Sequence, residues 1–499
     1  MSSRAALNEK IRDCSKSQIQ SLIEESQSKL ASFDSQIAAL IEQREQERVS
    51  LTALRSVIAP VWAIPVELLV EIFRCAIAVE YAFTIRDYAP TLRLSQVCAH
   101  WREVAHATPQ LWSGRVDITN HIPSKLSVSA YAEGLRSWLA HSAPLLIPIS
   151  ITPESDRRLS TCDWKDILPI LEEVLEISTR WRSFEILNPI ALRDLPAAFV
   201  QRLPGYAMDN LEELSLDEQS LTPFTLCFGK TPRLRIVSLA RNIRVPLSWS
   251  RITNLTLSEP PGFILRLLPH CNDLVYANFS VYGELTPAHA GVALQLKHLR
   301  TLSLYFYGNE PDTSWPFVSF LDRFNVPGLE HLRLSLQNVL AWSEPRFTSF
   351  QSKTPNITQF ELQCSEITST ELAAVLSHAP LLRSLRLKDC LRCLDHTFTD
   401  SLHYREGITP WVPRLEAFNL SCDPVSENLA VFETSLLDMI ASRWWANEAM
   451  DTLSSPPAVA RWAHLYIGPP RHHYGETFMN EVQKLKDSGL TIHVYNPQP

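Results

Sequence analysis

The sequence predicts an α/β protein with a long N-terminal helix, a short all-α region, and then a degenerate repeat solenoid with a curved parallel sheet. Three observations support this fold class. Residues 1–59 contain no glycine, proline, tryptophan or tyrosine, which favours one long helix. Two amphipathic helical patterns follow in residues 60–118. Residues 119–499 repeat one apolar pattern, so we divide the chain at these boundaries.

The composition excludes several classes of protein. The 499 residues include 34 prolines but only 13 glycines, and they contain no glycine-rich phosphate-binding motif and no GxSxG motif. We therefore expect recognition rather than catalysis, with no cofactor. The net charge of −8 disfavours nucleic acid as a partner. No apolar run reaches the roughly 20 residues that a membrane helix needs, so we expect no membrane partner.

The ten cysteines bear on location. They are scattered along the chain, which is typical of reduced thiols. The N-terminus lacks the apolar stretch of a signal peptide. We therefore expect a cytoplasmic or nuclear protein.

Residues 1–59 are predicted to form one long helix or a coiled coil. Apolar residues repeat at heptad spacing, and Arg44 and Glu47 fall on the same seam. The apolar seam consists of Ile19, Ile23, Leu30, Phe33, Ile37, Leu40, Leu51, Leu54 and Ile58. One interpretation is a homodimer through residues 19–58. The other, which the two polar seam positions favour, is a helix or helical hairpin that docks on its own chain.

Residues 60–118 contain two short amphipathic helical patterns. Pro60 ends the long helix, and Pro65 suits the first turn of the next one. Apolar faces follow at Leu68, Leu69, Ile72 and Phe73, and then at Leu94, Val97, Cys98, Trp101 and Ala105. Some 50 residues make a marginal core, so these faces need a partner, either within the chain or in another protein.

The residues of this region resemble an F-box. The motif Ile64-Pro65-x-Glu67-Leu68-Leu69-x-x-Ile72-Phe73 is followed by Leu94-x-x-Val97-Cys98-x-x-Trp101-Arg102 and by Pro109-x-Leu111-Trp112. It is similar in particular to the F-box of large fungal families, although residues 74–93 are longer than a compact F-box needs. The resemblance implies that the chain binds the Skp-type adaptor of a cullin-RING ubiquitin ligase. The implied adaptor-binding residues are Pro65, Leu68, Leu69, Ile72, Phe73, Leu94, Val97, Cys98, Trp101, Leu111 and Trp112.

The remaining residues repeat the pattern apolar-x-x-apolar-x-apolar. Twelve units begin at residues 146, 181, 211, 234, 252, 274, 299, 329, 357, 382, 415 and 462. From the second unit onward they lie on average about 28 residues apart, as in a leucine-rich repeat. Prolines stand two residues before six units, where they end the preceding helix and leave the chain extended: Pro144, Pro232, Pro327, Pro355, Pro380 and Pro413. Leu490, Ile492 and Val494 predict a final strand.

The residues between the apolar positions predict a polar concave face. This face is either a docking surface for an unknown protein target or an ordinary solvated sheet face. Arginine and tyrosine are frequent anchors in interfaces. The candidate target-binding residues are Tyr276, Tyr305, Arg333, Glu361, Arg386 and Lys388.

One cysteine motif has part of the spacing of a metal site. Cys390-x-x-Cys393 with His396 resembles half of a zinc site, and His378 and His403 are the nearest further candidates. A structural zinc site needs four ligands, and Cys390 stands where the repeat expects a buried asparagine or cysteine. We therefore expect no metal.

Two functions follow from this organisation. The first, which the F-box resemblance implies, is the substrate receptor of an SCF-type ligase, which holds the adaptor, and through it cullin and RING proteins. The alternative is a scaffold outside any ligase, built from the F-box and the repeats and assembled through the N-terminal coil.

Overall fold

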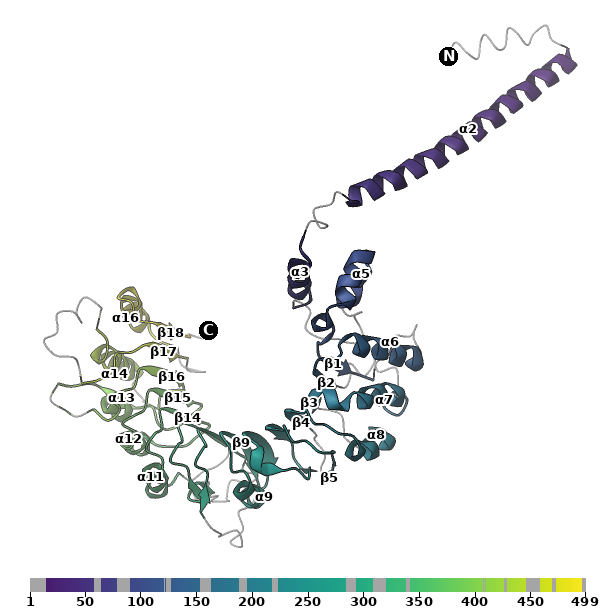
Figure 1. Cartoon of the computed structure of the whole chain (residues 1–499). Coiled ribbons are helices and arrows are strands. Elements are labelled where there is room, and N and C mark those ends of the chain that lie inside the picture. Colours follow the sequence, from purple (N-terminus) through teal and green to yellow (C-terminus); the bar gives the residue numbers. More distant parts are fainter. Residues whose placement is uncertain are drawn as a thin grey trace. The chain divides into compact units, whose positions relative to one another are not determined.

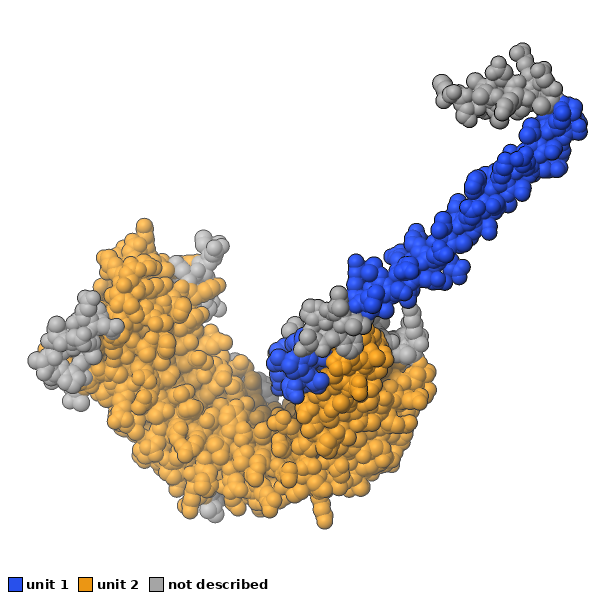
Figure 2. All heavy atoms as spheres, turned by 45° about the horizontal axis from the view of Figure 1, so that its top comes forward, with its two compact units in different colours: residues 1–78 blue, residues 79–499 orange. Residues whose placement is uncertain are grey.

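The computed structural model divides the chain into two compact units, residues 1–78 and 79–499 (Figure 2). This division falls inside the predicted helical region of residues 60–118. The structure describes residues 15–57, 64–78, 90–120, 122, 127–152, 163–187, 195–217, 223–283, 293–307, 320–337, 342–406, 408, 410–425, 429–445, 458–468 and 473–495.

The first unit contains two helices. Helix α2 spans Lys16–Val57, and α3 spans Val66–Ala78 (Figure 1). No residue interrupts the 42-residue α2, so the helical-hairpin interpretation of this segment is wrong. The physical reason is the absence of glycine and proline, which leaves no position where the chain could turn back. Within the described residues, no helix is both long enough and apolar enough to cross a membrane.

The second unit is built on one sheet of fourteen parallel strands. Its order is β1-β2-β3-β4-β6-β8-β9-β11-β13-β14-β15-β16-β17-β18, so neighbours in the sheet follow one another along the chain (Figure 1). The strands are β1 (Val116–Ile118), β2 (Ile147–Ile151), β3 (Trp181–Ile186), β4 (Glu213–Leu216), β6 (Ile236–Leu239), β8 (Asn254–Glu259), β9 (Tyr276–Tyr282), β11 (Thr301–Tyr307), β13 (His331–Gln337), β14 (Gln359–Gln363), β15 (Ser384–Lys388), β16 (Ala417–Ser421), β17 (His464–Ile467) and β18 (Ile492–Val494).

Helices cover one face of this sheet. Figure 1 shows them along the outer side of the curve that the strands follow within this unit. They are α6 (Val128–His141), α7 (Leu168–Glu176), α8 (Ala197–Arg202), α9 (Pro261–Leu267), α11 (Glu344–Ser352), α12 (Ser369–Ser377), α13 (His396–Leu402), α14 (Leu429–Ser442) and α16 (Glu476–Asp487). Short 3-10 turns η3 (Ser178–Arg180), η4 (Leu203–Gly205), η5 (Trp249–Arg251) and η6 (Leu268–His270) complete several connections.

The mixed α/β class with a leading helix and a long parallel sheet is confirmed. A strand forms within each of the twelve repeat units, and β18 forms at the predicted final strand. In most units the strand begins two residues after the first apolar position, which is buried in the turn before it. Leu382, for example, is fully buried and donates its N–H to the carbonyl of Ala379 at 3.1 Å.

Three features were not predicted. Strand β1 adds one strand before the first repeat unit. Two small parallel sheets pair β5 (Phe224–Thr225) with β7 (Ile243–Arg244) and β10 (Leu294–Gln295) with β12 (Phe324–Asn325). These strands are two or three residues long, which is too short for alternation of apolar and polar residues to reveal them.

The core lies between the sheet and its helices. Strands alternate buried and more exposed residues, as β8 does along its whole length. Two buried tryptophans fix helices against strands. The indole N–H of Trp181 donates to the carbonyl of Val174 at 3.0 Å, and that of Trp462 donates to Ile440 at 3.1 Å. A buried indole N–H needs such a partner, so each tryptophan sets the position of its helix.

Candidate adaptor-binding and target-binding surfaces

Helix α3 has a buried side and an exposed side. It begins after Pro65, whose carbonyl accepts the N–H of Leu69 at 3.0 Å. Leu69 and Phe73 are fully buried. Leu68 and Ile72, one position earlier in each case, are 57% and 48% exposed. Because large apolar side chains at this exposure gain from a partner, they are the candidates for recognition on this helix.

The second unit begins with α4 (Pro90–Ser95), α5 (Ala99–His106) and the 3-10 turn η2 (Pro109–Trp112). Cys98 caps α5, since its sulfur accepts the N–H of Trp101 at 3.4 Å. The Trp112 indole donates to the carbonyl of Ala105 at 2.7 Å, and the Thr91 hydroxyl donates to that of Leu111 at 2.6 Å. These bonds hold the two helices and the turn together.

The residues predicted from the F-box resemblance thus fall into three groups. Leu69, Phe73, Leu111 and Trp112 are buried, and Leu94, Cys98 and Trp101 are half-buried. Pro65, Leu68, Ile72 and Val97 are exposed, Val97 to 60%. Thr91 was not among the predicted residues, because it lies in residues 74–93, which the F-box resemblance treats as an insertion. Its only signal is its position directly after Pro90, at the start of α4.

A histidine pair connects α5 to α6, the first α-helix that follows it in the second unit. The rings of His106 in α5 and His141 at the end of α6 stack with centroids 4.3 Å apart, and the Trp112 ring lies 4.7 Å from that of His141. Burial, His141 and Arg102 all lower the pKa of His106. The contact is therefore most favourable when the His106 ring is neutral.

A comparison with protein-family models gives the decisive observation for this region. Residues 61–116 match the F-box-like family. This F-box-like region contains α3, α4, α5 and η2. F-box domains bind Skp-type adaptors, so the match suggests the role of an F-box subunit in an SCF-type ligase. No curated protein matches the chain.

The predicted target-binding residues lie on neighbouring strands of the sheet. Arg333 on β13, Glu361 on β14 and Arg386 on β15 occupy paired positions in the strand register. Glu361 lies between the two arginines, 3.4 Å from Arg333 Nε and 3.6 Å from Arg386 Nη1. The Arg333 guanidinium also lies 5.2 Å from the centre of the Tyr305 ring on β11. These four residues form one cluster, which we call the arginine cluster.

The other two predicted residues flank the arginine cluster. Tyr276 lies on β9, next to the strand that carries Tyr305, and Lys388 lies at the end of β15. Arg386 and Lys388 are exposed. Because one carboxylate faces two guanidinium groups and a lysine lies nearby, this part of the face carries a positive charge that an acidic partner would neutralise.

A second cluster of polar side chains, which the sequence did not predict, lies at the first three strands of the sheet. Arg115 donates to Asp117 on β1 at 2.7 Å and to the Ser150 hydroxyl on β2 at 2.9 Å, and it forms an ion pair with Glu185 on β3. The sequence could not reveal this group, because β1 itself was not predicted.

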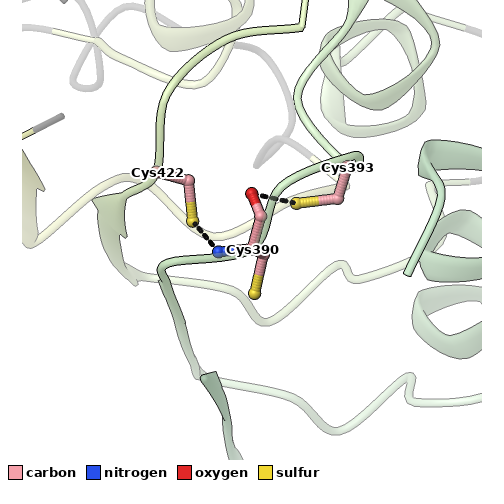
Figure 3. Close-up of side chains that lie close together, drawn as sticks. All are labelled: Cys390, Cys393 and Cys422. Atoms are coloured by element: carbon pink, nitrogen blue, oxygen red, sulfur yellow. Dashed lines mark hydrogen bonds between the residues drawn. The ribbon is translucent and has the colours of Figure 1, made fainter. Parts of the chain in front are cut away.

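The cysteine motif belongs to a larger cluster. The sulfur atoms of Cys390, Cys393 and Cys422 all lie within 4.8 Å of one another, and all three residues are buried (Figure 3). The backbone N–H of Cys390 donates to Cys422 Sγ at 3.2 Å. Hydrogen bonds from the other two thiols lower the pKa of Cys390 well below its usual value.

This cluster offers three ligand atoms. Among the described residues, no histidine, aspartate, glutamate or further cysteine joins it, so the candidates His378, His396 and His403 lie outside. A structural zinc site uses four ligands. The sequence does not connect Cys422 to this motif, because Cys422 follows a different strand and no local spacing links it to Cys390.

Proposed function

We propose that the chain is the substrate receptor of an SCF-type ubiquitin ligase. The F-box of residues 60–118 binds a Skp-type adaptor, and a leucine-rich-repeat-like solenoid of residues 119–499 binds a protein target. The F-box-like match to residues 61–116 carries this proposal. The long parallel sheet with helices on one face supports a solenoid, because strand–helix repeats stack in this way.

The exposed apolar residues of the F-box-like region are the proposed adaptor contacts. Leu68, Ile72 and Val97 are available to a partner, and the half-buried Leu94 and Trp101 present part of their surfaces. The buried residues of the predicted set support these contacts by fixing the helices. In this role the adaptor brings cullin and RING proteins to the chain, and the chain catalyses no reaction itself.

The polar face around the arginine cluster is the proposed target site. An acidic segment of the target would neutralise Arg386 and Lys388, while Tyr276 and Tyr305 would supply aromatic contact area. Binding both proteins at once raises the effective concentration of the target near the ligase. We place this protein in the cytoplasm or nucleus and assign it to the fungal type of F-box protein.

Adaptor binding is the first test. We expect Leu68→Asp together with Ile72→Asp to abolish co-purification with a Skp-type adaptor, because two charges would enter an apolar interface. Both side chains are exposed, so the fold should survive, as circular dichroism and thermal melting would show. Leu391→Asp is the matched control, since Leu391 is 65% exposed and lies outside the F-box-like region. Undiminished adaptor binding by the double variant would remove α3 from the proposed interface.

Target binding is tested in the same background. We expect proximity labelling with the Leu68→Asp, Ile72→Asp double variant, which cannot bind the adaptor, to enrich proteins that the intact ligase removes. Adding Arg386→Glu and Lys388→Glu should then eliminate that enrichment, because the positive face becomes negative. Charge reversal at Lys484, an exposed residue of α16, is the control. A set of enriched proteins that ignores the reversal would place the target site elsewhere.

The scaffold alternative rests on a different observation. Helix α2 exposes ten large apolar side chains, which suits an assembly element. A chain that forms a stable oligomer but does not bind the adaptor would favour the scaffold. Analytical ultracentrifugation with and without purified adaptor separates the two functions.

A further inference from the structure

Helix α2 carries an apolar seam along one side. Among the described residues of the first unit, no other element covers this seam. Ten of the large apolar side chains of α2 are 48% to 70% exposed, and Ile19 near the start of the helix is half-buried. The seam residues Leu30, Phe33, Ile37, Leu40, Leu51 and Leu54 occupy the a and d positions of a heptad repeat. Ile58 continues the pattern in the sequence and lies outside the described residues.

We propose that α2 pairs with α2 of a second copy in antiparallel orientation, with Arg44 of each chain opposite Glu47 of the other. The register of the two helices decides the orientation. In an antiparallel pair each a residue packs against a d residue of the partner helix. In one antiparallel register, the residue numbers of every facing pair add up to the same value. When Arg44 faces Glu47, that value is 91. Leu40 then faces Leu51, and Ile37 faces Leu54.

All six layers between residues 37 and 54 are matched in this register. Four are purely aliphatic, and the two central layers each join an arginine to a glutamate. A shift of one heptad in either direction breaks this match. One direction places Glu47 against Ile37, and the other places Glu47 against Leu51. Burying a charge against an aliphatic side chain is unfavourable, so the register is well specified.

The charges beside the seam agree with the same register. The e positions of antiparallel helices face one another, which brings Asp34 of each chain to Arg55 of the other. In the described structure Arg44 forms only an exposed ion pair with the adjacent Glu45, at 2.9 Å. It is therefore available to a partner at little cost.

A parallel dimer fits the sequence less well. In register it would place Arg44 against Arg44 and Glu47 against Glu47 in consecutive core layers. Like charges at facing positions are unfavourable, and charge pattern is a known determinant of helix orientation. The seam's two polar positions, which weaken a parallel coil, thus become the feature that specifies the antiparallel one.

The mass of the full-length protein is the first test. We expect a dimer by analytical ultracentrifugation. Arg44→Glu alone or Glu47→Arg alone should raise the dimer dissociation constant at least about tenfold, because two like-charge layers replace two opposite-charge ones. The double exchange Arg44→Glu with Glu47→Arg should restore the dissociation constant to within about threefold of the original. Glu42→Arg, on the outer face of α2, is the matched control and should leave the mass unchanged.

The orientation is tested by a distance measurement. A genetically encoded spin label at Ser28 leaves the native cysteines untouched. The antiparallel pair separates the two labels by about 50 Å, at 1.5 Å per residue. A parallel pair holds them within about 30 Å.

Several results would overturn the proposal. These are a monomer at every concentration, a short label distance, and single charge exchanges without effect on the dissociation constant. Adaptor binding by the charge variants should be normal in every case, because the F-box-like region is unaltered. Failure of this proposal is therefore distinguishable from failure of the proposed ligase function.

Discussion

At the scale of single residues, the stacked histidines make the stability of the second unit depend on pH. The pKa of His106 is lowered by burial and by the positive charges of His141 and Arg102. The unfolded chain therefore binds its proton more readily than the folded chain does. The stabilisation from this group is complete above the ordinary histidine pKa, and it is lost as the pH falls below that value.

We expect the melting temperature of the second unit to be lower at pH 5.5 than at pH 7.5, because the unfolded chain takes up the proton of His106 more readily than the folded chain. His106→Gln should flatten the pH dependence, because it removes the group that titrates differently in the two states. His464→Gln, at an exposed histidine with no stacked partner among the described residues, should leave it unchanged. An identical pH profile in His106→Gln would show that this histidine pair does not control stability.

Arg443 is a second residue whose role can be tested. It is 1% exposed, donates to the carbonyl of Val412 at 2.6 Å, and lies 5.0 Å from the centre of the Trp462 ring. Burial lowers its pKa to about 10. Its Nε and Nη1 atoms have no hydrogen-bond partner among the described residues. A buried charge with so few partners costs free energy.

Replacing Arg443 should therefore separate packing from charge. Arg443→Met keeps most of the volume and should change the free energy of unfolding by less than about 1 kcal/mol. Arg443→Ala leaves a cavity beside Trp462 and should cost about 2–4 kcal/mol. Urea unfolding measures both values. Equal losses in the two variants would show that the bond to Val412 matters more than the packing.

At the scale of elements, α12 shows how a local sequence signal fixes a repeat. Thr368 and Glu371 form a capping box, in which the Thr368 hydroxyl accepts the N–H of Glu371 and the Glu371 carboxylate accepts the N–H of Thr368. We expect Thr368→Ala to lower the free energy of unfolding by about 1 kcal/mol. Thr434→Ala, at an exposed mid-helix residue of α14, should cost less than half of this amount. An equal loss in both variants would mean that the cap is unimportant for the repeat.

Elements of this kind were predictable, whereas clusters between elements were not. The apolar units and their prolines predicted the position of β15, because burial and the constraints of proline act within a few residues. The same argument placed Arg333, Glu361 and Arg386 on one face. It could not show that Glu361 lies between the arginines, because that depends on the register of three strands. Cys422 joins Cys390 and Cys393 for the same reason, and β1 was too short to be recognised.

At the scale of the whole molecule, each of the fourteen strands in the large sheet pairs only with the strands that come directly before and after it in the sheet order. A change at its C-terminal end should therefore have a local effect. We expect Trp462→Ala to increase hydrogen exchange in β16, β17, α14 and α16 while β2 to β8 stay protected, as mass spectrometry would show. Uniform loss of protection across the sheet would mean that the unit unfolds as a single cooperative block.

The order of the strands also has a consequence for synthesis in the cell. From β2 onward, every strand of the large sheet pairs with a strand that was synthesised before it. The sheet can therefore grow at its newest edge while translation continues, and no strand waits for a distant one. A premature stop codon would release a shorter sheet with a bare apolar edge, which we expect quality-control factors to recognise.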